Sequence, residues 1–540
     1  MIRALLSVLA GVMAIAPVAS SAQQAASSAV CPGNHAPTVD LADPFAQRLR
    51  LAQLDSAAPH HSLTIRRASF ERKVPFCAPA SAEPVPSGAI RPLPLRVRTL
   101  YNSEYPLNVN NGTVWAGAGL SGTLEGGADL RFGPVHASVY PIVTYQQNEE
   151  FPQREVSLSG RSPHIYAGHP GRIDWPQRHG DEAFWTIHPG QSSVWLEAVG
   201  AALGVSTENL WIGSAQRTPL MMSNTAPGFP HVFLGTARPV HTPIGAFEAH
   251  TFWGQLRESD YFDNDPDNDR NLLVGTSLVW EPVFMRGLFL GAHRSYVVPF
   301  DQPDWSFLNY ILEPFYDLRG NPPDDNKLLS VFGRWVLPAS RFEVYAEWGR
   351  EDGWGEWVDL LREADHSQAF VLGLQKLTGT QERTFRWWAE LAHLQHAAAV
   401  RGGRGTVTLY VHNEILQGYT NRGQLLGAWI GPGANSQIIG VDHIQSARST
   451  GLAIERVRFD ADAYYNQWAR FYGETGHDAS ISMWLRHTES FGRGVMAAAT
   501  ASVGRRQNRH FVRFTGQQPA DLHWETNAHL DLEVRWNPRR

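Results

Sequence analysis

The sequence predicts an all-β fold: a transmembrane antiparallel β-barrel of about 18 strands, with a small N-terminal helical periplasmic region and irregular lumen or rim segments. Three observations predict it. The chain starts with an export signal, no later apolar run reaches the ~18 residues of a membrane helix, and much of the chain alternates polar and apolar residues. Its 540 residues include 19 Trp, 48 Gly and 35 Pro, which indicates an aromatic-rich protein with many turns.

Residues 1–22 have the organisation of a signal peptide. Arg3 supplies the positive charge, Ala4 to Val18 is almost entirely apolar, and Ser20-Ser21-Ala22 offers the small residues of a cleavage site. The apolar run is too short to span a membrane as a helix. We therefore expect cleavage after Ala22 and export of the mature chain.

Residues 23–94 are expected to form a periplasmic region that ends in a Pro-rich linker. Within it, Asp43 to Leu54 has a helix N-cap, a proline at the first helical position and apolar residues at helical spacing. The chain's two cysteines, Cys31 and Cys77, also lie here, and Val30 before Cys31 argues against a lipid anchor. A Cys31–Cys77 disulfide and two free thiols both remain open, and neither cysteine belongs to a zinc pattern.

Residues 95–540 are expected to form the barrel, because the sequence period there is two. From Trp524 to Trp536, the even-numbered residues are mostly apolar and the odd-numbered ones mostly charged or polar; "RFEVYAEWGRED" (341–352) behaves similarly. A soluble β-sandwich would show the same alternation. The density of charge on the polar faces favours a wet lumen, and Trp and Tyr near strand ends favour interfacial girdles, so the barrel is the preferred interpretation.

Two segments break the alternation. Residues 149–192 show little strand character, and Pro219–Pro230 places three prolines and two adjacent methionines between strand-like flanks. Irregular backbone at membrane depth is tolerated only inside protein or along a watery cavity. Both segments are therefore expected to fill the lumen or line its rim.

Neither catalysis nor a metal site is expected from the motifs. Asp365-His366-Ser367 holds the three residue types of a hydrolytic triad, but triad groups converge from separated positions. Asp263, Asp265 and Asp267 have the odd spacing of a calcium loop, but the glycine and glutamate of an EF-hand are absent at the required places. A solvated acidic loop is the preferred interpretation, and Ca²⁺ bound in another geometry is the alternative.

Glycan sites combine aromatic rings, which pack on the apolar face of a sugar, with side chains that hydrogen-bond hydroxyl groups. Three expected loops, 260–271, 301–325 and 351–366, have this composition. The candidate glycan-binding residues are Tyr261, Asp263, Trp305, Tyr316, Asp352, Trp354 and Trp357. For each aromatic residue alone, a place in the interfacial girdle is the competing interpretation.

The sequence resembles the capsule-assembly Wzi family of outer-membrane β-barrels over nearly the whole mature chain. The most specific stretch is "VSTENLWIGSAQRTPLMMSNTAPGFPHVFLGT" (205–236), supported by "GRIDWPQRHGD" (171–181) and "GYTNRGQLLGAWIGPGANSQIIGVD" (418–442). The resemblance implies a barrel of about eighteen strands that binds extracellular polysaccharide as a lectin and attaches capsule to the cell surface. It implies no catalysis and no cofactor.

The expected partners are therefore an extracellular or capsular polysaccharide and the lipids of the outer membrane, with the protein acting as a monomer. A net charge of −6 over this length does not indicate a surface that binds nucleic acid. The alternative is an outer-membrane porin or sugar channel, which would need an open lumen. A second alternative, a soluble periplasmic β protein, would bury its apolar faces.

Overall fold

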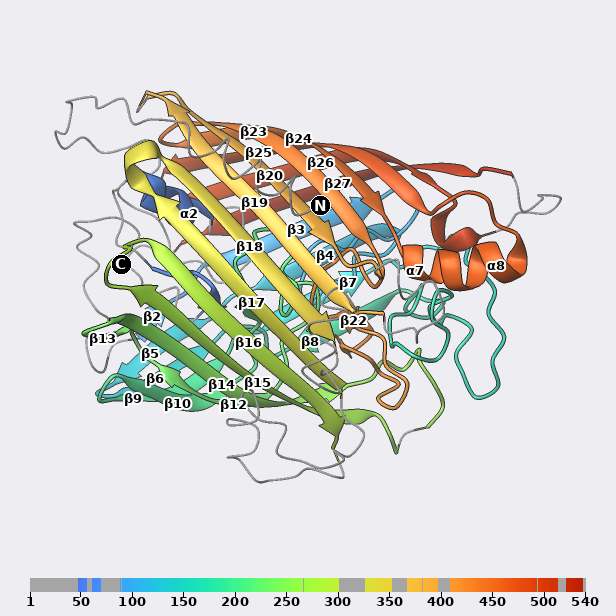
Figure 1. The fold of residues 1–540 in the computed structure, drawn as a ribbon, viewed down its shortest axis with the longest axis horizontal. Helices are drawn as coiled ribbons and strands as arrows, with labels where there is room; N and C mark the ends of the chain where they lie inside the picture. Colours follow the sequence, from blue (N-terminus) through green and yellow to red (C-terminus); the bar gives the residue numbers. More distant parts are fainter. Residues whose placement is uncertain are drawn as a thin grey trace.

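The structure, a computed structural model, describes residues 47–55, 61–68, 88, 90–265, 267–300, 326–351, 367–380, 382–396, 408–492, 494–512 and 521–537. These residues form one closed antiparallel barrel (Figure 1). The ring closes where β27 (Trp524–Trp536) pairs with β3 (Leu95–Asn102), with Leu532 opposite Thr99. No helix among the described residues is long and apolar enough to cross a membrane.

Short segments build the first part of the wall. They are β2 (Ile90–Pro92), β3, β4 (Gly119–Glu125), β5 (Ala128–Phe132), β6 (Val135–Val139), β7 (Ile142–Gln146), β8 (Phe184–His188), β9 (Ser193–Ala198), β10 (Ala201–Ser206), β12 (His231–Thr236) and β13 (Val240–Thr242). Gly127 lies at one of the interruptions, between β4 and β5, where a Cβ would lie 1.8 Å from the carbonyl oxygen of Val139. Only glycine fits such an approach.

Longer strands build the rest. They are β14 (Gly245–Arg257), β15 (Arg270–Pro282), β16 (Leu288–Pro299), β17 (Asn326–Leu337), β18 (Phe342–Glu351), β19 (Gln368–Gly379), β20 (Thr384–His393), β23 (Asn435–Ile444), β24 (Arg448–Arg458), β25 (Ala479–Gly492), β26 (Val495–Gln507) and β27. The pairs β2/β3, β4/β5, β6/β7, β8/β9 and β12/β13 each make one interrupted crossing. The 23 wall segments of the described chain therefore cross eighteen times, which confirms the predicted barrel.

The two faces of the wall are distributed as the alternation predicts. On β27, Leu532 and Val534 are 44% and 51% exposed, whereas Glu533 and Arg535 are 4% and 0% exposed. A soluble sandwich would bury the apolar face and expose the charged one. The reverse is found, so the apolar band faces lipid and the charged residues face the lumen, and the soluble alternative is wrong.

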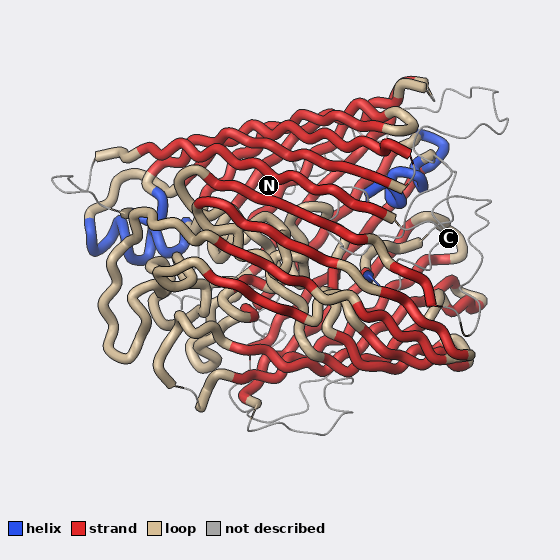
Figure 2. Tube along the Cα trace, turned by 180° about the vertical axis from the view of Figure 1, so that it is seen from behind, coloured by secondary structure: helices blue, strands red, loops and turns tan. Residues whose placement is uncertain are grey.

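The two ends of the barrel differ in the length of their connections. One end has short turns, for example residues 199–200 and 380–383, and the other has long connections such as 147–183 and 394–434. Outer-membrane barrels have short periplasmic turns and longer extracellular loops. The long connections gather at one end, together with α7 (Ala461–Ala463), η2 (Tyr464–Trp468) and α8 (Ala469–Tyr472) (Figure 2). That end is the outer face.

Helix α2 (Gln47–Leu54) lies at the other end and packs against η1 (Pro338–Ser340), the turn between β17 and β18. It falls inside the helix expected over Asp43–Leu54, whose first residues, like the signal peptide and both cysteines, lie outside the described residues. One expectation was wrong in part: the end of 149–192 is a wall strand. In β8 the outward Trp185 and Ile187 alternate with inward residues over only five positions, too few to stand out in the sequence.

Candidate functional site

The connection between β10 and β12, residues 207–230, lies inside the barrel. Residues 218–229 are all buried. Glu347 of β18 accepts the backbone N–H groups of Ala215 (2.6 Å) and Leu220 (2.9 Å), and the Tyr410 hydroxyl donates to the Leu220 carbonyl (2.6 Å). The proline-rich run is therefore a lumen segment and not a surface loop. Its irregular backbone is stabilised by carboxylates and hydroxyls that the polar strand faces supply.

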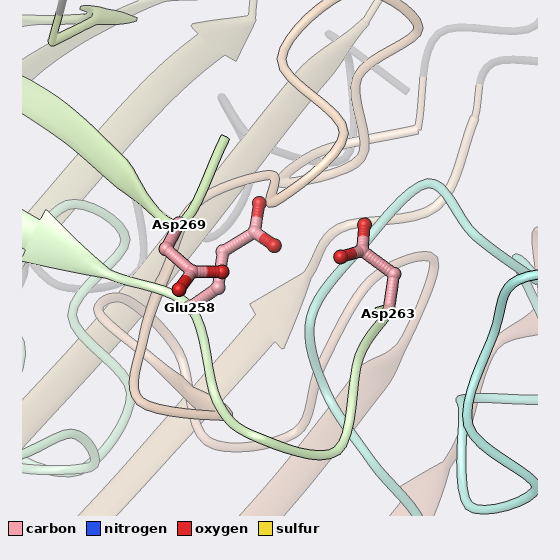
Figure 3. A group of neighbouring side chains, drawn as sticks. All are labelled: Glu258, Asp263 and Asp269. Carbon is pink, nitrogen blue, oxygen red and sulfur yellow. The ribbon is translucent and has the colours of Figure 1, made fainter. Parts of the chain in front are cut away.

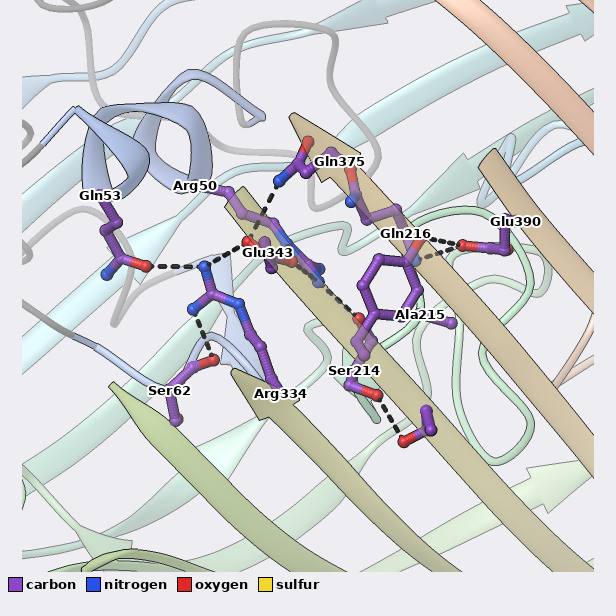
Figure 4. A network of polar contacts seen from close by, with 12 residues as sticks. Arg50, Gln53, Ser62, Ser214, Ala215, Gln216, Arg334, Glu343, Gln375 and Glu390 are labelled. Atoms are coloured by element: carbon purple, nitrogen blue, oxygen red, sulfur yellow. Dashed lines mark hydrogen bonds and ion pairs between the residues drawn. The ribbon is translucent and has the colours of Figure 1, made fainter. Parts of the chain in front are cut away.

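Helix α2 occupies the lumen at the periplasmic end. Figure 4 shows Glu343 of β18 between two guanidinium groups: Arg50 Nε donates to Oε1 (2.7 Å) and Arg334 Nη2 to Oε2 (2.9 Å). Arg334 Nη2 also donates to Oε1 of Gln53 on the helix (2.8 Å). Arg50, Arg334 and Glu343 are buried, so the helix is fixed to β17 and β18 by a desolvated charge cluster.

Tyr261 and Asp263 are the two predicted glycan residues that the structure describes. Asp263 forms an ion pair with Arg161 and a β-bridge to it, which ties the β14–β15 loop to the connection 147–183. Burial lowers the pKa of His179 to about 3, so its neutral ring packs against Tyr261 with 5.4 Å between centroids. Both residues thus contact a neighbouring loop, a context that sequence spacing does not reveal.

The remaining predicted residues of this set lie outside the described residues: Trp305, Tyr316, Asp352, Trp354 and Trp357. Asp365 and His366 of the rejected triad motif lie there too. Their role in glycan binding stays a prediction.

Three carboxylates gather beside the β14–β15 loop. Glu258, Asp263 and Asp269 each place an oxygen within 4.8 Å of the others, and they are the residues here that could hold a cation (Figure 3). Burial, reinforced by the neighbouring Asp174, Asp263 and Asp269, raises the pKa of Glu258 to about 9. Glu258 is therefore protonated at neutral pH, and the ion pair of Asp263 with Arg161 already compensates one of the other charges.

A cleft of about 420 Å³ opens among the outer loops, where the sequence predicted none. Its walls come from the connection 147–183, the connection 394–434 and the helical segment after β24. The lining side chains are mainly polar and include Arg172, Asn413, Glu414, Asn466, Gln467 and Phe471. Phe471, which belongs to α8, is 69% exposed.

Asp460 joins two walls of this cleft, the connection 147–183 and the helical segment after β24. Its backbone adopts a left-handed conformation before α7, and its Oδ1 accepts the N–H of Ala463 as a helix cap (3.0 Å). The other oxygen accepts the Tyr166 hydroxyl (2.7 Å), and His169 Nε2 lies 3.1 Å from Oδ1. Burial disfavours a charged imidazole, but Asp460 outweighs it and raises the pKa of His169. One carboxylate therefore fixes the connection 147–183 to the start of α7.

Four of the polar side chains that line the cleft take no part in this framework. No described residue hydrogen-bonds the side chains of Asn413, Asn466 or Gln467, or the guanidinium of Arg172. These groups offer amide and guanidinium donors and amide acceptors around one exposed ring. Such a set can hydrogen-bond hydroxyl groups while an apolar face packs on the phenyl ring. Sequence reasoning missed these residues because they follow no period and carry no motif.

The sequence profile of the family described as Capsule assembly protein Wzi matches residues 110–539. The chain belongs to this family. No curated protein sequence matches it. Membership confirms the expected family and places the protein in the outer membrane.

One solved structure in particular shares the fold of this chain. Wzi of Escherichia coli, described as an outer membrane protein involved in group 1 capsule assembly and as a carbohydrate-binding β-barrel, superposes with a TM-score of 0.61 at 13% identity. The match covers 92% of this chain and 99% of that one, and shows a shared fold. OccAB2 and OccAB1 of Acinetobacter baumannii give TM-scores of 0.41 and 0.40 at 10% identity, over 84% of this chain and 99% and 98% of theirs.

Proposed function

We propose that this Wzi-family barrel binds exported polysaccharide at its outer face and thereby attaches capsule or exopolysaccharide to the cell surface. Family membership and the carbohydrate-binding barrel that it superposes on support the proposal. The observation that carries it is the outer cleft, with one exposed phenyl ring among unpaired amide and guanidinium groups. The protein would act as a monomer in outer-membrane lipid and leave the polymer chemically unchanged.

The filled lumen favours attachment over transport. Residues 218–229 are buried inside the barrel, and α2 occupies its periplasmic end. A porin or sugar channel, the alternative, needs a continuous aqueous path. Recording single-channel currents in planar bilayers tests the two functions: we expect little or no ion conductance, and a stable open channel would favour the alternative.

Glycan binding is tested directly with detergent-purified protein and polysaccharide from the source organism. Phe471→Ala should weaken binding by about two- to tenfold, because one aromatic packing contact is lost. Tyr472→Ala is the matched control: Tyr472 is the next residue on α8 and 48% exposed, but its ring packs on Trp468 and does not line the cleft. Equal affinities for the two variants would contradict the cleft as the binding site.

The loops predicted from sequence are tested in cells, by measuring the polysaccharide that stays on the cell surface. Replacing Tyr261, Trp305 and Trp354 together with alanine should release polymer into the medium while synthesis and export continue, if these loops share in binding. Each site can be weak, since repeated units on one polymer engage many copies of the protein. Retention that depends on Phe471 but not on this triple variant would confine the binding surface to the cleft.

A further inference from the structure

A second cavity, of about 140 Å³, lies within the barrel between α2, the lumen segment and the wall strands β3, β20 and β25–β27. Its lining is strongly basic. Seven arginines border it: Arg50, Arg66, Arg96, Arg98, Arg217, Arg386 and Arg486. Among the described residues, the acidic ones that border it are Asp531 and Glu533. We call this cavity the arginine chamber.

Most of these guanidinium groups are compensated by carboxylates in or behind the chamber wall. The ion pairs are Arg50–Glu343, Arg96–Glu125, Arg96–Glu533, Arg98–Asp531, Arg217–Glu455 and Arg386–Asp442. Three arginines also lie over indole rings: Arg66 over Trp211 (5.5 Å), Arg217 over Trp484 (4.7 Å) and Arg386 over Trp388 (5.0 Å). The chamber wall is therefore preorganised, with its cations held before any ligand arrives.

Arg486 of β25 differs from the rest. No described residue forms a hydrogen bond or ion pair with its guanidinium, although it lines the chamber. The carboxylates whose charge it senses, Asp442 and Asp531, are already bound to Arg386 and Arg98. The other charges it senses are the cations Arg217 and Arg386. Arg486 is half-buried and faces other cations, and a partly desolvated cation in this setting is costly unless an anion compensates it.

We propose that the arginine chamber binds one small oxyanion, held by Arg486 with the help of its basic neighbours. The chemistry fits a tetrahedral sulfate or phosphate and equally the carboxylate of a sugar acid, because guanidinium groups bind both kinds of oxygen anion. A volume of about 140 Å³ accommodates either ligand with a few water molecules. The site is separate from the outer cleft and does not depend on glycan binding there.

The structure offers a way to occupy the site covalently. Thr500 of β26 also lines the chamber and is the cross-strand partner of Arg486. Directly opposed residues on one face of a sheet lie within reach of each other's side chains. Thr500→Glu therefore tethers a carboxylate beside Arg486, where it replaces the anion; Thr500→Gln has nearly the same shape and no charge.

The test is equilibrium dialysis of detergent-purified full-length protein against labelled sulfate, with chloride holding ionic strength constant. Wild type and Thr500→Gln should bind sulfate alike. Arg486→Met and Thr500→Glu should bind it at least about tenfold more weakly, the loss expected for one charge-assisted hydrogen bond. Arg456→Met is the arginine control, since Arg456 lies on neighbouring β24 and contacts Gln437 outside the chamber.

Competition by phosphate and by glucuronate then identifies the source of the anion. If phosphate displaces sulfate at a lower concentration than glucuronate does, the natural ligand is an inorganic anion. If glucuronate displaces it at the lower concentration, the natural ligand is a sugar acid. Absence of sulfate binding to the wild type, or equal binding by wild type and Thr500→Glu, overturns the proposal. The wild-type measurement decides the matter even if a variant fails to fold.

Discussion

Glu343 is the residue whose replacement should loosen α2 most. In Glu343→Gln, the charge between Arg50 and Arg334 disappears while the shape of the side chain is kept. Arg50 Nε and Arg334 Nη2 donate to the carboxylate at 2.7 and 2.9 Å, and Gln375 adds a third bond at 3.1 Å. Both cations are buried and would remain so. Removing one partner of a buried ion pair costs about 3–5 kcal/mol, and we expect that loss in the free energy of unfolding.

The assay is urea unfolding of the protein in lipid or detergent, with planar-bilayer currents as a second readout for release of the helix. Glu489→Gln is the control, because the His487–Glu489 pair (3.5 Å) is more than a third exposed and such pairs contribute about 0–1 kcal/mol. If Glu343→Gln unfolds at the wild-type urea concentration and shows wild-type conductance, Glu343 does not anchor the helix and the reasoning fails.

Three further predictions concern the lipid face of β27, the buried carboxyl group of Glu258 and the mature N-terminus. Leu532→Arg, on the lipid face of β27, should lower the free energy of unfolding by about 2–4 kcal/mol. Thr526→Arg lies nearer the strand end and should lower it by about 0–1 kcal/mol. If urea unfolding shows equal losses for the two variants, the membrane is placed wrongly on the strand. Burial and neighbouring carboxylates raise the pKa of Glu258 from 4.5 to about 9, so the folded state holds this proton more tightly than the unfolded state. Stability should therefore fall as pH rises between these values, and Glu258→Gln should flatten that dependence; unchanged pH profiles would contradict it. Intact mass should place the mature N-terminus at Gln23, and a chain that retains Arg3 would contradict export.

The wall could be predicted from sequence because lipid and lumen impose opposite demands on alternate residues. From Trp524 to Trp536 the pattern assigns the buried and exposed faces, as the exposure of Leu532 and burial of Glu533 confirm. The five-residue β8 was missed because alternation over so short a stretch is no stronger than chance. Wall strands interrupted by glycine, as at Gly127, also leave a weak pattern.

For the lumen and the outer cleft, the sequence predicted the type of structure but not the residues that contact one another. Pro219–Pro230 was recognised as irregular backbone in need of a polar enclosure, but the sequence could not name Glu347 and Tyr410 as its partners. Arg50 and Glu343 are 293 residues apart, and no local pattern couples them. Tyr166, His169 and Asp460 likewise meet only after the barrel brings their loops together.

In the outer cleft, the residue that anchors the loops differs from several of the residues that line the cleft. Asp460 fixes the loops, whereas Asn466, Gln467 and Phe471 line the cleft without hydrogen bonds to the described framework. Substitutions at the second group therefore cost the barrel little stability and change chiefly what the surface recognises. Related bacteria that coat themselves with different polymers could diverge at these positions while keeping one scaffold. Aligned relatives should accordingly vary at 466, 467 and 471 and retain an acidic residue at 460.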